Sequence, residues 1–295
     1  MTPFHNKLWQ LLAFSRIPGN AVSFWIRKTL HWSRGNPTLY QESKDDLFAY
    51  LHEGRSEADE RSAHLRARYQ LDPLAQLSTV AVYRKNLYLL DTLEHATESL
   101  QFPSLENNVV KALDVGSQNW NYVFALERWL QFHNRVEGGK VRLKGIEVDG
   151  HEIYADFHSR QDYAKAYVDQ TGNPEVRYEI GNFLKSREAG YDVVSIFYPF
   201  VLRYQLLLWG LPLRFFSPQN ILTQAATLTR SGGWLVVLCH TLREHELFLE
   251  LGRSSGAYEL LREGQALSNL VDFHGKVNDR RFSIWKKNAE VVLKG

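Results

Sequence analysis

The chain has 295 residues, of which 44% are apolar and 23% charged, and its formal net charge at pH 7 is +2. This composition is typical of a globular protein with room for one large domain, or for an α/β domain with a smaller one beside it. The small net charge gives no strong signal for nucleic acid. The single cysteine, Cys239, excludes an internal disulfide and is compatible with a cytoplasmic location. No cysteine–histidine cluster indicates a metal site, and no apolar run reaches the ~18 residues of a transmembrane helix.

The first 41 residues contain no aspartate or glutamate and are rich in basic and aromatic side chains. The pattern predicts two short helices, at about 4–15 and 20–32, separated by the break Pro18-Gly19. Such helices can lie on a membrane surface, and they can equally pack on the rest of the chain or on a second subunit. The apolar stretch is too short for a secretory signal and lacks a cleavage site of small residues.

Residues 42–108 are expected to be helical, which gives a helical region over 1–108. Ser43 can cap a helix that continues to His52, with two aspartates in its first turn. The longest helical pattern covers Leu74–Leu100 and ends before a loop that contains Pro103.

From residue 109 onward, segments typical of strands alternate with segments typical of helices. This alternation predicts a doubly wound, mostly parallel sheet over 109–295, with an antiparallel last strand. The predicted strands are Val109–Gly116, Val141–Val148, Glu175–Ile180, Tyr191–Tyr198, Trp234–Cys239, Tyr258–Leu261 and Arg281–Lys286. The predicted helices between them are Ser117–Arg135, His151–Asp169, Ser217 to Arg230 and Glu244–Leu251, with Ser231-Gly232-Gly233 ending the third.

The segment VVKALDVG, Val109–Gly116, ends a buried strand in a tight glycine turn before a helix. A strand, a glycine turn and a helix start form a pocket for a nucleotide-like ligand, because bare backbone and free N–H groups lie close together there. The alternative is an ordinary strand–turn–helix corner.

LDVGSQNW resembles the first motif of class I S-adenosylmethionine-dependent methyltransferases, an acid followed by three spaced glycines. Asp114 and Gly116 fit this motif, whereas Gln118 and Trp120 stand where the second and third glycines are usual. The segment ATLTRSGGWLVVL strongly resembles the family's helix–Gly-Gly–strand unit before the fifth strand. The resemblance covers about residues 109–290 and implies a Rossmann-like fold that binds S-adenosylmethionine (SAM).

The resemblance also implies which residues bind the cofactor. GIE places the family's ribose-binding acid at Glu147, with Asp149 as a second candidate, since a carboxylate can accept from both hydroxyls of a ribose. Asn182 and Phe183 follow the third strand, where the family recognises adenine by an acceptor and a stacking side chain. The full set of expected cofactor residues is Asp114, Gly116, Ser117, Gln118, Glu147, Asp149, Asn182 and Phe183.

Methyl transfer from SAM needs alignment more than covalent help, and a general base is useful only where the acceptor must lose a proton. His240, at the end of the fifth strand, is the first candidate base and Tyr198 the second. The helical region 1–108 is then, by analogy, a cap over the acceptor, or an oligomer or membrane contact.

The segment Val201–Phe216 is apolar, and it must be buried by the N-terminal helices, a second subunit, an apolar acceptor or lipid. The leading function is methyl transfer to a small, lipophilic acceptor by a cytoplasmic enzyme that can also sit at a membrane surface. The alternatives are a non-catalytic protein-interaction module with this fold and an RNA methyltransferase.

Overall fold

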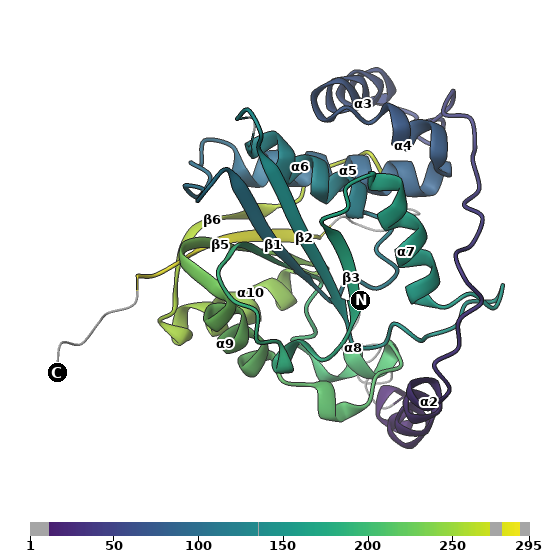
Figure 1. The fold of residues 1–295 in the computed structure, drawn as a ribbon, viewed down its shortest axis with the longest axis vertical. Coiled ribbons are helices and arrows are strands. Elements are labelled where there is room, and N and C mark those ends of the chain that lie inside the picture. The colour runs from purple at the N-terminus through teal and green to yellow at the C-terminus, as the bar shows by residue number, and fades with distance from the viewer. Residues whose placement is uncertain (1–11, 135, 272–278, 290–295) are drawn as a thin grey trace.

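A computed structural model describes residues 12–134, 136–271 and 279–289. A seven-stranded sheet lies between two layers of helices, and the chain before the sheet runs along one side of the molecule (Figure 1). Both faces of the sheet are covered, which explains why its central strands, at 109–115, 191–197 and 234–239, are nearly continuous apolar runs rather than alternating ones.

The sheet has the strand order β3-β2-β1-β4-β5-β7-β6. Only β7 runs antiparallel to its neighbours, so the predicted doubly wound sheet with an antiparallel last strand is confirmed. The strands are β1 (Val109–Val115), β2 (Lys140–Glu147), β3 (Val176–Ile180), β4 (Tyr191–Phe197), β5 (Thr229–Cys239), β6 (Tyr258–Gln265) and β7 (Arg281–Lys287).

Two buried clusters fill the spaces between the sheet and the helices. Val110 and Ala112 of β1 belong to the first cluster, and Leu113 and Val115 to the second, so successive side chains serve opposite faces. The helices of the first face are α3 (Arg55–Tyr69), α4 (Asp72–Leu77), α5 (Val80–Thr97), α6 (Val123–His133) and α7 (Arg160–Thr171). Those of the second face are α9 (Pro218–Leu228) and α10 (Leu242–Ser255). Because α3 to α5 share the first cluster, the residues before β1 and the sheet have a common core.

A third cluster joins the N-terminal helix α2 (Ile17–Leu30) to the apolar segment after β4. That segment forms α8 (Arg203–Leu208) and the 3-10 turn η2 (Leu213–Phe215), and another 3-10 turn, η1 (Phe183–Lys185), follows β3. Phe24 of α2 packs against Phe215, with ring centroids 4.9 Å apart. The Asn20 amide donates to the backbone oxygens of Leu207 (2.8 Å) and Leu211 (3.1 Å). An N-terminal helix therefore buries part of the apolar segment, as one of the sequence readings proposed.

Two details of the predicted N-terminal helices are wrong. Residues 12–15 are helical and a turn at Arg16 separates them from α2, so the break precedes Pro18 and Gly19. These two residues lie inside the first turn of α2, where a proline blocks no helical hydrogen bond. Residues 45–50 form turns instead of the expected helix. The Ser43 hydroxyl bonds to Asp45, both to its side chain and to its N–H, so it closes a local turn and caps no helix. The predicted helix at 4–15 falls largely on residues outside the described ranges.

Three boundaries in the sheet domain also differ. α6 starts at Val123 and not at residue 117, since residues 117–122 form a turn. α7 starts only at Arg160, where Ser159 and Asp162 form a capping box. Gly232 and Gly233 lie within β5 and do not end a helix. A Cβ on Gly233 would lie 3.0 Å from the Asp192 oxygen, so this glycine permits close approach to β4 beside a register shift.

Candidate functional site

A cavity lies at the carboxyl ends of β1, β2, β3 and β4, where open α/β sheets bind ligands. Its volume is about 130 Å³. The strand ends contribute Gly116, Gln118, Glu147, Asn182 and Phe183. Five of the eight predicted cofactor residues are thus brought together around one cavity.

The turn after β1 forms the floor of this cavity and keeps a left-handed backbone at three alternate positions. Gly116 has φ +77°, Gln118 has φ +55° and Trp120 has φ +53°. A Cβ on Gly116 would meet no atom within 4 Å, so the glycine faces open space. Residues other than glycine adopt this conformation at a cost of roughly 1–2 kcal/mol, which surrounding contacts must offset.

Glu147 and Tyr178 fix the turn from two neighbouring strands. The Glu147 carboxylate accepts from the backbone N–H of Gln118 and of Asp149, each at 2.9 Å. The Tyr178 hydroxyl donates to the Gln118 oxygen at 2.6 Å. Each Glu147 oxygen keeps a further lone pair while it lines the cavity, so the carboxylate can still accept from a ligand.

Gly181 directly follows β3, and its N–H donates to the Glu147 backbone oxygen at 2.9 Å. The Asn182 side-chain oxygen accepts from the Leu184 N–H at 3.0 Å and so caps η1. This oxygen retains one lone pair, and Phe183 also lines the cavity. An acceptor and an aromatic side chain therefore both lie at the cavity where they follow the third strand.

The roof of the cavity comes from the apolar segment after β4. Phe200, Trp209, Leu211 and Phe215 line it. These residues belong to no motif and were not predicted to line the site, although the apolar character of 201–216 indicated a segment that must be buried against something. Because α2 packs on the same segment, the N-terminal helix supports the roof.

A second cavity, of about 290 Å³, adjoins the first and shares Gly116, Gln118, Phe197, Tyr198 and Trp209 with it. Both predicted candidate bases lie here. His240 lines this cavity, and its ring stacks on Tyr198 with centroids 3.8 Å apart and an interplanar angle of 12°. Tyr198 itself has φ +62°, a conformation that non-glycine residues adopt mainly at constrained sites.

The electrostatics of the second cavity make both candidate bases weak. Burial, with a further contribution from Arg280, lowers the pKa of His240 to about 4. Burial raises the pKa of Tyr198, although the nearby Arg280 guanidinium counteracts part of the shift. Both groups are therefore neutral at pH 7, and His240 has little driving force to remove a proton.

Three predicted cofactor residues lie outside the cavity lining. Asp114 is fully buried beneath the turn and accepts from the hydroxyls of Ser195 (2.5 Å) and Tyr122 (2.7 Å). Ser117 is fully buried as well. Asp149 is paired with Arg27 of α2 at 2.8 Å, which ties the N-terminal helix to the end of β2.

The second cavity contains two residues that the sequence analysis missed, Lys85 and Arg280. Neither belongs to a motif, and they are almost 200 positions apart, so only the fold brings them together. Within the described ranges, no group of three or more His, Cys, Asp or Glu side chains could hold a metal ion, and no helix is long and apolar enough to cross a membrane.

No protein-family model and no curated protein matches this sequence. Solved structures do resemble it. TrmN from Thermus thermophilus has 14% identity and a TM-score of 0.44, over 68% of this chain and 48% of that chain. A SAM-dependent methyltransferase from Aquifex aeolicus has 14% identity and a TM-score of 0.46, over 70% of this chain and 93% of that chain.

The N-methyltransferase NodS from Bradyrhizobium japonicum, in complex with S-adenosyl-L-homocysteine, has 13% identity and a TM-score of 0.43, over 78% of this chain and 99% of that chain. The match to TrmN spans about half of that protein's length. At these low identities, the similarity between this chain and the three proteins is one of fold.

Proposed function

We propose that the chain binds SAM and transfers its methyl group to a small acceptor, on the strength of its sheet topology and of the motif resemblance at Val109–Gly116. The observation that carries this proposal is the pair of adjoining cavities at the carboxyl ends of β1 to β4, with Glu147 on the wall of the first. The residues before β1 contribute α5 to the second cavity, which fits a region that covers the acceptor.

The residues of the first cavity fit this cofactor. Glu147 would hold the ribose hydroxyls, Asn182 would accept from the adenine amine and Phe183 would pack on the ring. Gly116 leaves a cradle that any side chain would fill, and the amino-acid end of the cofactor would lie over it. The first cavity is smaller than the ~300 Å³ usual for small-molecule sites, so the cofactor would extend into the second.

The left-handed backbone of the turn argues for binding and against a purely scaffolding role. Gln118 and Trp120 replace glycines of the motif, yet they keep positive φ angles. A chain that had lost its ligand would gain stability by relaxing such strained positions. The backbone that the cofactor needs is therefore retained despite the changed side chains.

SAM, when bound, supplies an activated methyl group on a sulfonium, and its leaving group is a neutral thioether. The protein's contribution is then to align the reactants and to exclude water, which the aromatic roof of Phe200, Trp209 and Phe215 does. His240 and Tyr198 line the place where an acceptor would enter. Since both are neutral and weakly basic, we propose that they orient the acceptor and do not deprotonate it.

The binding proposal predicts that the full chain binds S-adenosylhomocysteine (SAH) in calorimetry. Glu147→Gln is expected to weaken this binding about tenfold, or ~1.4 kcal/mol, because the amide offers one acceptor oxygen and no charge. Glu175→Gln changes an exposed glutamate that pairs with Arg142, and it should bind SAH as the wild type does. A wild-type chain that releases no heat with SAH, and shows no thermal shift with it, would exclude the proposed function.

We also propose that α2 rests on an anionic membrane surface. Val22, Trp25, Ile26 and Leu30 lie on one side of the helix and are exposed, with Trp25 at 64% and Leu30 at 71%. The opposite side, with Phe24, is buried against the roof segment. A helix that is apolar on both sides, with basic and no acidic residues in its own sequence, fits the boundary between headgroups and acyl chains.

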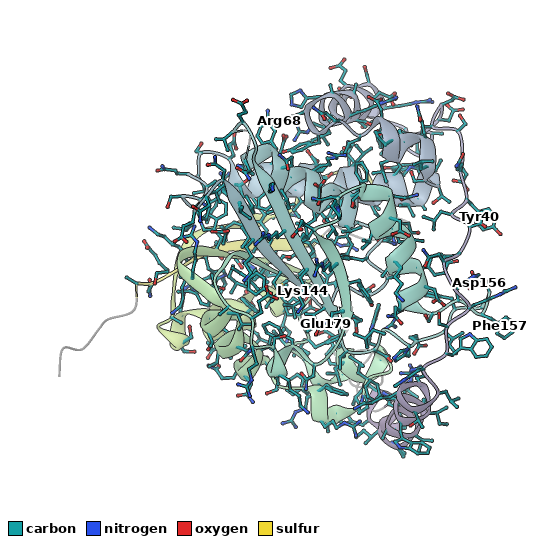
Figure 2. The ribbon with its side chains drawn as sticks, viewed as in Figure 1. Tyr40, Arg68, Lys144, Asp156, Phe157 and Glu179 are labelled. Atoms are coloured by element: carbon teal, nitrogen blue, oxygen red, sulfur yellow. The ribbon has the colours of Figure 1, made fainter. Side chains whose placement is uncertain are left out.

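The neighbouring surface extends this apolar face. Figure 2 shows Phe157 at the periphery of the molecule, and this side chain is 63% exposed. The Trp32 indole N–H donates to the Phe157 backbone oxygen at 2.8 Å, so a second exposed aromatic ring lies beside the first. Aromatic side chains with one polar end are favoured at membrane interfaces.

The membrane proposal predicts that the chain sediments with vesicles of phosphatidylcholine and phosphatidylglycerol. The double variant Trp25→Glu, Leu30→Glu should reduce vesicle binding at least about tenfold, since it removes two large apolar contacts. The matched variant Val136→Glu, Leu267→Glu changes two exposed apolar residues elsewhere and should sediment as the wild type does. Equal sedimentation of both variants would show that α2 makes no membrane contact.

A further inference from the structure

One side of α2 connects the roof of the first cavity to the strand end below it. Asn20, Phe24 and Arg27 follow one another at four- and three-residue spacing, so they lie on the same side of the helix. Asn20 bonds to the backbone of the roof segment, and Phe24 packs on Phe215. Arg27 instead reaches Asp149, which follows the end of β2. The helix therefore holds the roof and the strand end together.

The contact between Arg27 and Asp149 is a bidentate ion pair. Nε of Arg27 donates to Oδ1 at 3.1 Å and Nη2 to Oδ2 at 2.8 Å. The Asp149 side chain is only 2% exposed. Arg160 also approaches this carboxylate, with Nη1 3.6 Å from Oδ2, and Arg27 further contacts Glu152 at 2.9 Å. A buried carboxylate depends on such partners, so without Arg27 the Asp149 side chain would be driven toward water.

Asp149 in turn holds the Glu147 carboxylate. The Asp149 N–H donates to Oε1 of Glu147, and the Gln118 N–H donates to Oε2, each at 2.9 Å. Asp149 lies in the turn 148–151 and not in the sheet, so its side-chain contacts help to fix the direction of this N–H. Glu147 lines the first cavity, whereas Arg27 and Asp149 line neither cavity. A series of direct contacts thus runs from α2 to a carboxylate that faces the cavity.

We infer that Arg27 is a positioning residue of the cofactor site, which orients the Glu147 carboxylate toward the ribose hydroxyls through Asp149. The inference rests on the proposed binding of SAM and gives the N-terminal helix a part in it. Hydrogen bonds weaken steeply when they are misaligned. Loss of Arg27 should therefore weaken recognition of the ribose more than recognition of the rest of the cofactor.

The test compares SAH with its 2′-deoxy analogue, each titrated by calorimetry into the full chain without vesicles. We expect the wild type to prefer SAH at least about tenfold, because the analogue lacks one hydrogen bond to a charged group. Arg27→Gln should lower the affinity for SAH about tenfold and the preference to about threefold or less. Arg27→Lys should lie between, because it keeps the charge and loses the planar fork.

Two further variants separate positioning from a general effect on the fold. In a Glu147→Gln background, Arg27→Gln should cost no more than about twofold in SAH affinity, since both changes act on one contact. Arg55→Gln breaks another Arg–Asp pair of 2.8 Å, on the surface of α3, and should bind both ligands as the wild type does. Thermal unfolding shows which variants are folded, and Arg27→Lys provides the test if Arg27→Gln does not fold.

A second measurement needs no ligand. The backbone N–H groups of Gln118 and Asp149 both donate to Glu147. Their hydrogen exchange, followed by NMR, should be at least about fivefold faster in Arg27→Gln than in the wild type, because the carboxylate that protects them is less firmly held. Arg55→Gln should leave both rates unchanged.

An unchanged SAH affinity in Arg27→Gln would overturn the inference. An equal loss of affinity for SAH and its analogue, or an undiminished effect in the Glu147→Gln background, would overturn it as well, since Arg27 would then only support the fold. A wild type that does not bind SAH removes the proposed function instead. In that case faster exchange at Gln118 and Asp149 would still show that Arg27 positions Glu147, and unchanged exchange would exclude it.

Discussion

Gly116→Val is expected to lower the affinity for SAH at least about a hundredfold, or ~2.7 kcal/mol. The Cβ of the new side chain would enter open space between the two cavities, because no protein atom lies within 4 Å of its position. The valine methyl groups would then occupy the volume in which we place the amino-acid end of the cofactor. Calorimetry with SAH measures the change.

The substitution also strains the backbone, and a matched variant separates the two effects. Gly190 has φ +82°, close to the +77° of Gly116, and a Cβ there also meets no atom within 4 Å. Gly190 lies directly before β4, at the opposite end of the sheet from the cavities. Gly190→Val should therefore lose stability to a similar extent and keep its affinity for SAH. Equal affinities of the two variants would contradict the placement of the cofactor over Gly116.

The strands and the mostly parallel, doubly wound sheet follow closely from the sequence, for a physical reason. A parallel sheet covered on both faces requires continuous apolar strands, and the runs in β1, β4 and β5 have no other stable location. Crossover connections are right-handed and return beside their strand, which leaves few possible arrangements once the alternation is recognised.

Local boundaries were harder to predict, because one residue type serves several structures. Ser43 forms a turn where a helix cap was expected, and Ser159 caps a helix that was expected to begin earlier. Gly233 permits strand contact where a helix stop was expected. In each case the residue favours more than one local structure, and tertiary contacts decided which of them formed.

The residues of the candidate site also differ in how far the sequence predicts them. Gly116, Glu147 and Asn182 follow strands, so the rule that ligands collect at strand ends was sufficient to group them. Lys85 and Arg280 come from segments without a motif and meet only through packing of α5 beside β7. Asp149 was the second candidate after Glu147, but its partner Arg27 is 122 positions away and could not be foreseen from the sequence.

The buried carboxyl of Asp114 predicts how the stability of the fold depends on pH. Its carboxyl is fully buried, and this burial raises its pKa from 3.8 to about 6, although hydrogen bonds from Ser195 and Tyr122 favour the charged form. Between pH 4 and pH 6 the folded state therefore holds a proton that the unfolded state has released. Stability from this group is present below pH 4, falls as the pH rises to about 6 and is constant above it.

We expect the difference in unfolding free energy between Asp114→Asn and the wild type to move by roughly 3 kcal/mol in favour of the variant from pH 4 to pH 7. The amide does not ionise, and it can accept from Ser195 and donate to Tyr122. Urea unfolding at several pH values measures this difference, in which the titration of all other groups cancels. Asp59→Asn, at an exposed position of α3, should give a difference that is constant over the same range. A constant difference for Asp114→Asn as well would mean that the buried carboxyl keeps its ordinary pKa, and that its two hydroxyl partners fully offset the cost of burying its charge.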